Sequence, residues 1–325
     1  MSSANVGSCV LIGYQSGDAI NHADASGTVA IGKSALTALT SGIGNVAIGY
    51  QALDAEDDGD ANTAVGYQAF TQLNAASGYG AGVAIGYVAG AALTTGVNNT
   101  IVGAYALDAA TTALNNVAIG TEAMSAVPSG QAVDGCVAIG YQALTGAGGT
   151  TTGANNSIAI GSQSLKALTS GERNIAIGYQ AMDALPDGDD NIAIGYGALT
   201  DASTSATAKN VAIGSYAMEN LNANGASNVA IGYKALETAN SNDIDGNVAI
   251  GAECMDGIGT AGVWGSTGVG AGAMSGAMTA ASQGTVGIGY NTLAALTSGA
   301  GNVAVGYQSC AAMTSNTGNT ALGYQ

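Results

Sequence analysis

Few side chains in this sequence could carry catalytic chemistry. His22 is the only histidine, and it stands in a loop between repeated segments. Catalytic triads and Cys-His pairs both use histidine as a base, so neither can be assembled from recurring elements of the chain. The four cysteines, Cys9, Cys136, Cys254 and Cys310, include no Cys-x-x-Cys pair and no spacing typical of metal ligands. We therefore expect no enzyme activity and no cofactor, and we interpret the cysteines as substitutions at packing positions.

Clusters of carboxylates are the next candidates for chemistry. They lie at Asp54, Glu56, Asp57, Asp58 and Asp60, at Asp187, Asp189 and Asp190, and at Asp243 and Asp245. Calcium prefers oxygen-rich loops of this kind, although no complete calcium-loop motif is present. A solvated acidic rim that keeps an apolar chain soluble explains the same carboxylates without a metal. We favour the rim, assign no metal ligand, and keep calcium binding as the alternative.

Glycine-rich stretches and tyrosine rows complete the candidate sites. Residues 80–86 and 268–272 faintly resemble phosphate-binding loops, but their spacing is wrong and no βαβ unit follows. Tyr follows a recurring glycine eleven times, and Gln follows that Tyr seven times. Such rows could bind glycans by ring stacking, but we favour packing of the tyrosines against one another.

All these residues belong to a chain with an unusual charge and composition. It has 325 residues, a net charge of −17 and only five Lys and Arg residues. Nucleic acids and anionic membranes are held by clustered cations, so neither is an expected partner. The first residues show no signal-peptide pattern, and no apolar run is long enough to span a membrane. We expect a soluble protein.

One short phrase, for which Asn45–Leu53 (NVAIGYQAL) is a clean copy, recurs eighteen times and organises the sequence. Its glycine returns every 17 to 21 residues, at Gly13, Gly32, Gly49, Gly66, Gly86, Gly103, Gly120, Gly140, Gly161, Gly178, Gly195, Gly214, Gly232, Gly251, Gly270, Gly289, Gly306 and Gly323. A period of this length is typical of a solenoid, in which each repeat forms one rung. We predict a single solenoid domain over residues 1–325, uncapped at both ends.

Each rung begins with a predicted β-strand. Numbered from the glycine as zero, position −3 is Val, Ile or Thr and position −1 is Ile, Val or Leu in every copy. Position −2 is Ala in fourteen copies. Alternate residues share one face of a strand, and a strand that is apolar on both faces is typical of a parallel sheet covered on each side. The fold class we predict is therefore an all-β parallel β-solenoid, or β-roll, of about eighteen rungs.

The rest of each rung contains a second apolar pattern. Position +3 is usually Ala, and position +4 is Leu, Met or Phe in most copies. A further apolar residue often follows at +7, and this spacing indicates a short helical or 3-10 turn after the glycine. Asn at −4, as in Asn45, is expected to bond its own backbone or to adopt positive φ. A row of Asn side chains that binds a ligand is the alternative.

The alanine row suggests how copies associate. A solvated strand face would carry polar residues, so we expect another chain to cover the methyl groups, with three copies around a central axis. The predicted inter-chain ladder consists of Ala30, Ala47, Ala64, Ala84, Ala118, Ala138, Ala159, Ala176, Ala193, Ala212, Ala230, Ala249, Ala304 and Ala321. The predicted core ladder contains Val46, Ile48, Leu53, Ile175, Ile177, Met182, Val229, Ile231 and Leu236. In the alternative, position −2 faces the interior of its own solenoid, while −3 and −1 meet a neighbour.

The phrase Asn-Val-Ala-Ile-Gly-Tyr-Gln-Ala-Leu, followed in several rungs by Leu-Thr-Ser-Gly, resembles repeats in the shafts of bacteriophage tail-fibre proteins, including those with a C-terminal intramolecular chaperone. Its Val-Ala-Ile-Gly core is also similar to the β-roll heads of trimeric autotransporter adhesins. This resemblance covers the whole chain and implies a homotrimeric, non-enzymatic fibre or spike of a virion that contacts a host surface. Its implied partners are copies of itself, end-capping proteins and host glycans. The alternatives are a bacterial extracellular adhesin or a self-stacking surface filament.

Overall fold

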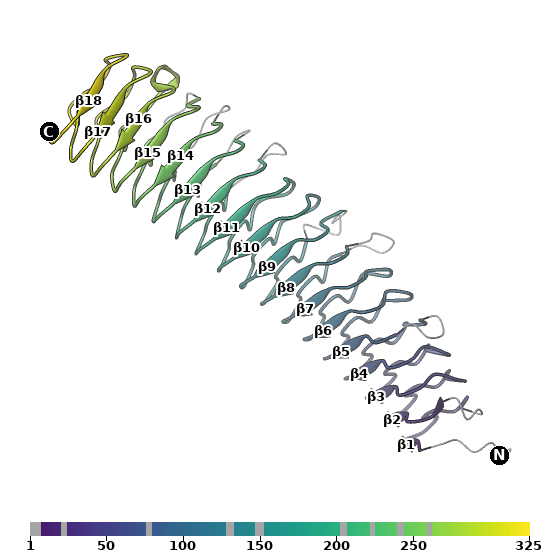
Figure 1. Ribbon diagram of the computed structural model, residues 1–325. Helices are drawn as coiled ribbons and strands as arrows, with labels where there is room; N and C mark the ends of the chain where they lie inside the picture. The colour runs from purple at the N-terminus through teal and green to yellow at the C-terminus, as the bar shows by residue number, and fades with distance from the viewer. Residues whose placement is uncertain are drawn as a thin grey trace. The chain divides into compact units, whose positions relative to one another are not determined.

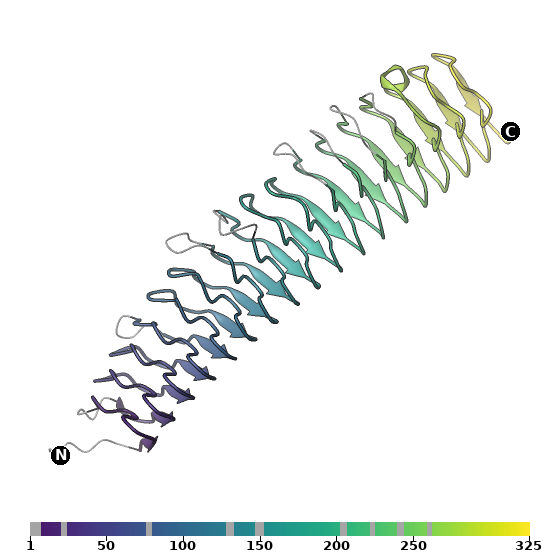
Figure 2. The same ribbon diagram turned by 180° about the vertical axis from the view of Figure 1, so that it is seen from behind.

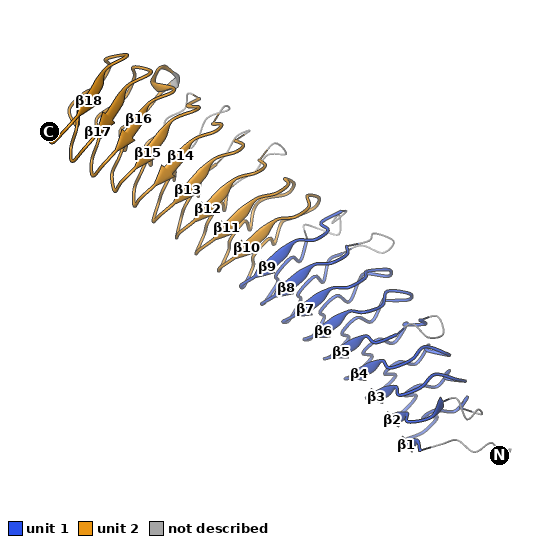
Figure 3. Ribbon diagram, viewed as in Figure 1, with its two compact units in different colours: residues 1–162 blue, residues 163–325 orange. Residues whose placement is uncertain are grey.

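The computed structural model describes residues 8–20, 25–75, 80–127, 133–146, 153–201, 207–221, 225–238, 244–258 and 262–325. These residues divide into two compact units, 1–162 and 163–325, shown in blue and orange in Figure 3. Each unit is a parallel β-solenoid, so the predicted fold class is confirmed. That the two units form a single domain stays a prediction.

The first unit contains nine strands of three residues each, which lie side by side in chain order (Figure 1). They are β1 (Val10–Ile12), β2 (Val29–Ile31), β3 (Val46–Ile48), β4 (Thr63–Val65), β5 (Val83–Ile85), β6 (Thr100–Val102), β7 (Val117–Ile119), β8 (Val137–Ile139) and β9 (Ile158–Ile160). Every neighbouring pair is parallel, because each strand is followed by a return segment that brings the chain back to the same starting edge.

The second unit repeats this arrangement, and Figure 2 shows its strand arrows from behind. Its strands are β10 (Ile175–Ile177), β11 (Ile192–Ile194), β12 (Val211–Ile213), β13 (Val229–Ile231), β14 (Val248–Ile250), β15 (Thr267–Val269), β16 (Val286–Ile288), β17 (Val303–Val305) and β18 (Thr320–Leu322). A 3-10 helix, η2 (Ala280–Ser282), lies between β15 and β16. All eighteen predicted strands are therefore present.

The register of the strands keeps equivalent positions in straight columns. Val46 pairs with Thr63, Ala47 with Ala64, and Ile48 with Val65. The recurring glycine directly follows each strand, and its φ lies between +133° and +145°. A Cβ atom at Gly49 would also collide with the backbone carbonyl of Gly66. Only glycine fits both constraints, which explains why the chain turns at this residue in every rung.

The segment after the glycine is a turn rather than a helix. Position +2 has positive φ, as in Gln51 (52°), and position +4 does as well, as in Leu53 (50°). The Gln51 N–H donates to Lys33 O at 3.0 Å in the preceding rung, and the Leu53 N–H donates to Ala69 O at 3.1 Å in the following one. Hydrogen bonds between rungs therefore replace those of a helix. The predicted helical turn is wrong, because the segments that follow the glycines in the described part of the chain are hydrogen-bonded turns rather than helices.

Candidate functional site

The middle residue of each strand faces the interior of its own unit. It is buried in every strand from β2 to β17, whereas the first and last residues remain partly exposed. A Cβ atom at Gly287, a middle residue, would lie 2.9 Å from Cγ of Met274, which occupies position +4 of the preceding rung. Likewise, a Cβ atom at Gly268 would lie 3.2 Å from Cγ of Met255. The core therefore lies between the middle residues of the strands and the +4 side chains.

This packing corrects the predicted inter-chain ladder. Its alanines are covered by their own chain and not by sister chains: each from Ala30 to Ala304 is at most 1% exposed, and Ala321 in β18 is partly exposed. The physical reason is space, because a methyl group leaves room for the Leu or Met opposite it. The alternative, in which position −2 faces the interior of its own solenoid, is the arrangement that the structure has.

The predicted core ladder is correct for three residues and wrong for six. Leu53, Met182 and Leu236, all at position +4, are fully buried. The others belong to strands and lie on the opposite side of the sheet from the core: Val46, Ile48, Ile175, Ile177, Val229 and Ile231 are partly exposed or, for Ile48, 37% exposed. Alternate strand residues must face away from the alanine side, so burying one set turns the other outward.

We define the outer strand face as the first and last residues of strands β1–β18. All of its side chains are Val, Ile, Leu or Thr, and none is charged. From β2 to β17, exposure reaches 41% at Ile85, 39% at Ile288 and 38% at Val303. An uncovered sheet face is normally polar, so an apolar outer strand face is a candidate interaction surface.

Tyrosines form ladders immediately after the strands. The rings of Tyr50 and Tyr67 stack with centroids 5.1 Å apart and planes 13° apart, and Tyr67 stacks on Tyr87 in the same way at 5.2 Å and 12°. Tyr307 and Tyr324 stack at 5.1 Å and 8°. In these stacked pairs the ring faces lie against neighbouring rings, which favours packing over stacking on a sugar. The stacked tyrosines therefore fit the packing interpretation.

Asparagines at position −4 form a second ladder, inside each unit. The Asn191 side chain donates to Thr207 O at 2.9 Å, and its Oδ1 accepts the backbone N–H of Asn210 at 3.0 Å. Asn174 makes the same bond to the backbone of Asn191. These side chains are buried and bond neighbouring rungs rather than their own backbone. Positive φ occurs at position −5 instead, as in Asp190, so that part of the expectation is also corrected.

Burial also explains two cysteines. Cys136 and Cys254 are fully buried, and burial raises the pKa of Cys136 to about 11 and that of Cys254 to about 12. A thiol with such a pKa stays protonated at neutral pH and is a poor nucleophile. The Cys136 Sγ donates to Ala154 O at 3.0 Å. At position −4 it thus replaces an Asn side chain and, like those asparagines, bonds a neighbouring rung. Cys9 and Cys310 are partly exposed, and all four cysteines are free of disulfides.

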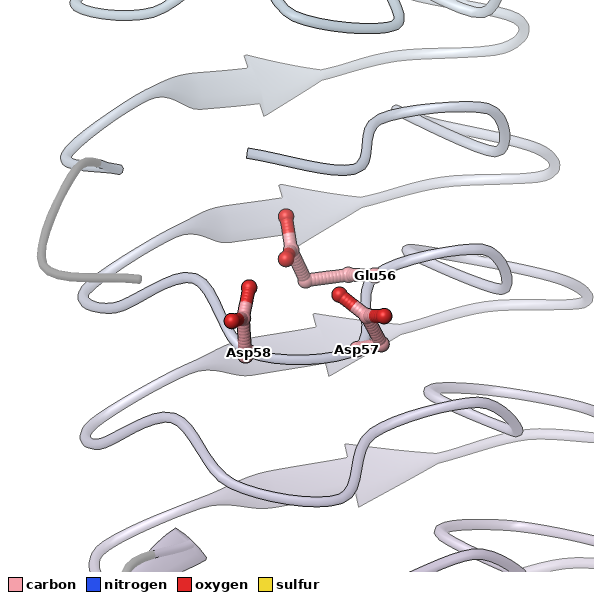
Figure 4. A group of neighbouring side chains, drawn as sticks. All are labelled: Glu56, Asp57 and Asp58. Atoms are coloured by element: carbon pink, nitrogen blue, oxygen red, sulfur yellow. The ribbon is translucent and has the colours of Figure 1, made fainter. Parts of the chain in front are cut away.

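The first acidic cluster contains one buried carboxylate. Figure 4 shows Glu56, Asp57 and Asp58 on the segment that connects β3 to β4. Glu56 is fully buried and accepts the backbone N–H of Gly59 at 2.7 Å and of Ala75 at 3.1 Å. Burial raises the pKa of Glu56, and these two hydrogen bonds oppose the increase. Both carboxylate oxygens thus hold the return segment in place, which is a structural role that the sequence did not reveal.

Other acidic residues bond the backbone of the preceding rung. Asp60 Oδ1 accepts the N–H of Ile43 at 2.7 Å, and Asp245 Oδ1 accepts that of Ala226 at 2.8 Å. Asp189 Oδ1 accepts the N–H of Glu172 at 2.8 Å, while Asp190 pairs with Arg173 at 2.6 Å. Asp243 and His22 lie outside the described residues. These carboxylates support loop structure, and calcium binding remains the alternative.

Comparison of the sequence with known protein families and with curated proteins finds no match. The residues of the structure themselves must therefore support a function. Within the described part of the chain, no helix is both long and apolar enough to cross a membrane. The feature that the geometry leaves without a structural role is the outer strand face, because the ladders of Ala, Asn and Leu or Met are all used inside each unit.

Proposed function

We propose that this chain is a structural, non-enzymatic fibre or spike protein of a bacteriophage virion, a tail fibre or related appendage. Such a protein projects outward and contributes to contact with the host surface. The observation that carries the proposal is the filled solenoid: each rung packs on the next through buried ladders, and an uncharged apolar strand face is turned outward. The assignment to a virion rests on the resemblance of the repeated phrase to tail-fibre shafts.

A filled interior favours a mechanical role over a ligand-binding one. Leu36, Leu53 and Phe70 are fully buried, and the alanines opposite them are too. Backbone hydrogen bonds join consecutive rungs at several positions, including Val29 N–H to Asn45 O at 2.8 Å. Repeated contacts of this kind add a similar stabilising interface at every rung, which suits a shaft that must resist bending.

The chemistry of the described residues does not favour catalysis. Cys136 and Cys254 are buried with raised pKa values, and Glu56 is engaged with backbone N–H groups. The partners we propose are copies of the same chain, virion proteins at its ends and host-surface glycans reached by the assembled fibre.

Immunoelectron microscopy tests the virion assignment. Antibodies raised against the purified chain are applied to phage particles and to cells of the source organism. We expect label on appendages of the particles. Label restricted to cell surfaces would overturn the proposal and favour an extracellular adhesin. Negative-stain images of the purified protein provide the second readout: particles of one finite length fit a fibre, whereas threads of unlimited length indicate a self-stacking filament.

A further inference from the structure

We infer that the surface around Trp264 binds the ring of a neutral sugar, a hexose or an N-acetylhexosamine within an oligosaccharide. This inference deepens the proposed function and rests on it, because host-surface glycans are among the partners proposed there. The indole of Trp264 provides an aromatic platform, the polar side chains of Asp245 and Gln283 flank it, and open space above neighbouring glycines leaves room for the ligand.

Trp264 is an unusual residue for a protein surface. It is the only tryptophan of the chain, it lies just before β15, and it is 52% exposed. Within the described residues, its indole stacks on no other ring and its Nε1–H has no hydrogen-bond acceptor. The stacked tyrosines, in contrast, place their ring faces against one another. The indole is therefore available to a ligand, whereas the rings of the stacked tyrosines are engaged with each other.

Polar residues flank Trp264 on both sides along the solenoid. Asp245 and Gln283 hold the same position, −6, in the preceding and following rungs, where Asp245 is exposed and Gln283 is half-buried. The Gly265 N–H donates to Asp245 O at 3.0 Å, and the Gly284 N–H donates to Trp264 O at 3.2 Å, so these rungs adjoin. A carboxylate accepts hydrogen bonds, and an amide both donates and accepts them. Such groups suit the hydroxyl groups of a sugar, and an aromatic side chain with a few polar neighbours is typical of small-ligand sites.

Open backbone lies beside this row of side chains. Position −5 is glycine in each rung from β14 to β18, the green to yellow part of Figure 1, at Gly246, Gly265, Gly284, Gly301 and Gly318. Apart from its chain neighbours, a Cβ atom on any of these glycines would meet no atom within 4 Å. Four strand spacings of ~4.8 Å give a length of roughly 19 Å. A short oligosaccharide that stacks on Trp264 can therefore continue over these glycines.

The backbone does not require glycine at position −5. Gly284 has a φ of 62°, and the same slot in earlier rungs holds Asn98 at 61°, Asp190 at 61° and Lys209 at 60°. Asparagine and aspartate tolerate this conformation. Side chains are therefore compatible with the fold at this position, and their absence from the rungs around Trp264 is not a consequence of backbone geometry. It keeps the space beside the indole clear.

The surroundings of the indole also select the class of ligand. Trp264 stands among glycines and polar side chains, which favours a sugar ring over an apolar peptide. The C–H groups on one face of a pyranose can pack on the indole, while its hydroxyl groups reach the polar neighbours. The chain carries a net charge of −17, and Asp245 adds a carboxylate at the site itself. Anionic sugars are therefore repelled, and neutral ones are expected.

Tryptophan fluorescence provides the first test. Because Trp264 is the only tryptophan, emission excited where tyrosine does not absorb reports on this site alone. The purified chain is titrated with four neutral probes, chitotriose, cellotetraose, mannotriose and N-acetyllactosamine, and with the anionic polymer polygalacturonate. We expect at least one neutral probe to change the emission saturably, and polygalacturonate to leave it unchanged. No saturable change with any neutral probe at millimolar concentration, or equal binding of polygalacturonate, overturns the inference.

Isothermal titration calorimetry with the neutral probe that binds most tightly then tests the indole. Trp264→Ala should weaken binding at least about tenfold, and Trp264→Phe, which keeps an aromatic face, should retain part of the affinity. The matched control is Ile43→Ala, because Ile43 is an exposed apolar residue at the same position in the rung of β3. It should bind as the wild type does. Circular dichroism confirms that each variant is folded.

A second pair of variants tests the open space. Gly284→Asn places a side chain beside the indole and should also weaken binding at least about tenfold, because the side chain occupies the path of the sugar. Asn98 occupies the same slot, so this variant should fold. Gly44→Asn makes the same change in the rung of β3, where a Cβ atom also meets no atom within 4 Å. It should leave the affinity unchanged.

Unchanged affinity in folded Trp264→Ala or Gly284→Asn overturns the inference, because both variants change the surface that the sugar must contact. The proposed function can fail separately. Sugar binding that depends on Trp264, together with antibodies that label no virion, would preserve the sugar site and remove the virion assignment. Labelled virions whose purified chain binds none of the neutral probes would do the reverse.

Discussion

The phenyl ring of Phe70 occupies the space that a side chain at Gly90 would need. A Cβ atom at Gly90 would lie 2.7 Å from Cε1 of Phe70 and 2.9 Å from Cδ1 of Ile101. Phe70 and Gly90 hold position +4 in consecutive rungs, and Ile101 replaces the usual alanine of the next strand. Phe70, Gly90 and Ile101 therefore fill together the core volume that two leucines and an alanine fill in other rungs. The total side-chain volume of the core stays similar from rung to rung.

This relationship predicts energetic coupling between Phe70 and Gly90. Gly90→Leu alone should destabilise the protein by about 1–3 kcal/mol, because the core beside Phe70 has no free volume. In the presence of Phe70→Leu, which makes room, the same substitution should cost less, and the coupling energy should exceed about 0.5 kcal/mol. Denaturant unfolding of the four members of the cycle measures it. Additive effects would show that the ring and the glycine do not share this space.

The backbone conformation of Val88 leads us to predict a stabilising substitution. Its φ is 59°, a left-handed conformation that β-branched residues rarely adopt. The same slot holds Gly197, Gly272 and Asn291 in other rungs. Asparagine tolerates this conformation, so Val88→Asn should raise the free energy of unfolding by about 1 kcal/mol. Thermal melting checks this, and Val88→Thr, which keeps the branched Cβ, should give no gain. A lower melting temperature for Val88→Asn would refute the strain argument.

The sequence predicted the positions of the strands because the same three apolar residues precede a glycine in every rung. It could not decide which face of the strand is inside. Val46, Ala47 and Ile48 are all apolar, so the pattern is compatible with burial of either face. The outcome depends on Leu53, whose bulk needs the small neighbour, and that packing relationship becomes visible only in three dimensions.

Two other features were hidden from the sequence for different reasons. Spacing of three between apolar residues is typical of a helix, but a turn that places Leu53 at positive φ produces the same spacing. Glu56 stands beside three aspartates and resembles a solvated carboxylate. It is buried because the backbone N–H groups of Gly59 and Ala75 converge on it. Neither the residue types of Gly59 and Ala75 nor their distances along the sequence from Glu56 would lead one to predict these hydrogen bonds.

The asparagine ladder predicts a graded loss of stability. Asn191→Ala removes a donor to Thr207 O and an acceptor for the Asn210 N–H, which leaves two buried backbone groups without a partner. We expect a loss of about 2–4 kcal/mol, since each unsatisfied group costs about 1–3 kcal/mol. Asn191→Ser should cost less, because Ser266 in the same slot accepts the N–H of Thr285 at 3.3 Å. Chemical denaturation measures both variants, and equal losses would contradict the role of the amide.

The raised pKa of Asp108 leads to a prediction of how the stability of the protein depends on pH. Burial raises its pKa from 3.8 to about 6; its own backbone N–H opposes the increase, and the nearby charge of Glu122 adds to it. The folded state therefore binds the proton more tightly than the unfolded state does. The stability that this group contributes is present below pH 3.8 and is lost as the pH rises from 3.8 to about 6.

Asp108→Asn removes this ionisation and should therefore be more stable than the wild type at pH 7, with the difference disappearing near pH 3.5. Because the side chain is partly exposed, we expect a difference on the order of 1 kcal/mol rather than the full value of the pKa shift. Urea unfolding at a series of pH values measures it. Asp54→Asn, in the same slot of an earlier rung, controls for the loss of one negative charge. A stability difference between Asp108→Asn and the wild type that stays constant from pH 3.5 to 7 would mean that burial does not perturb this carboxyl group.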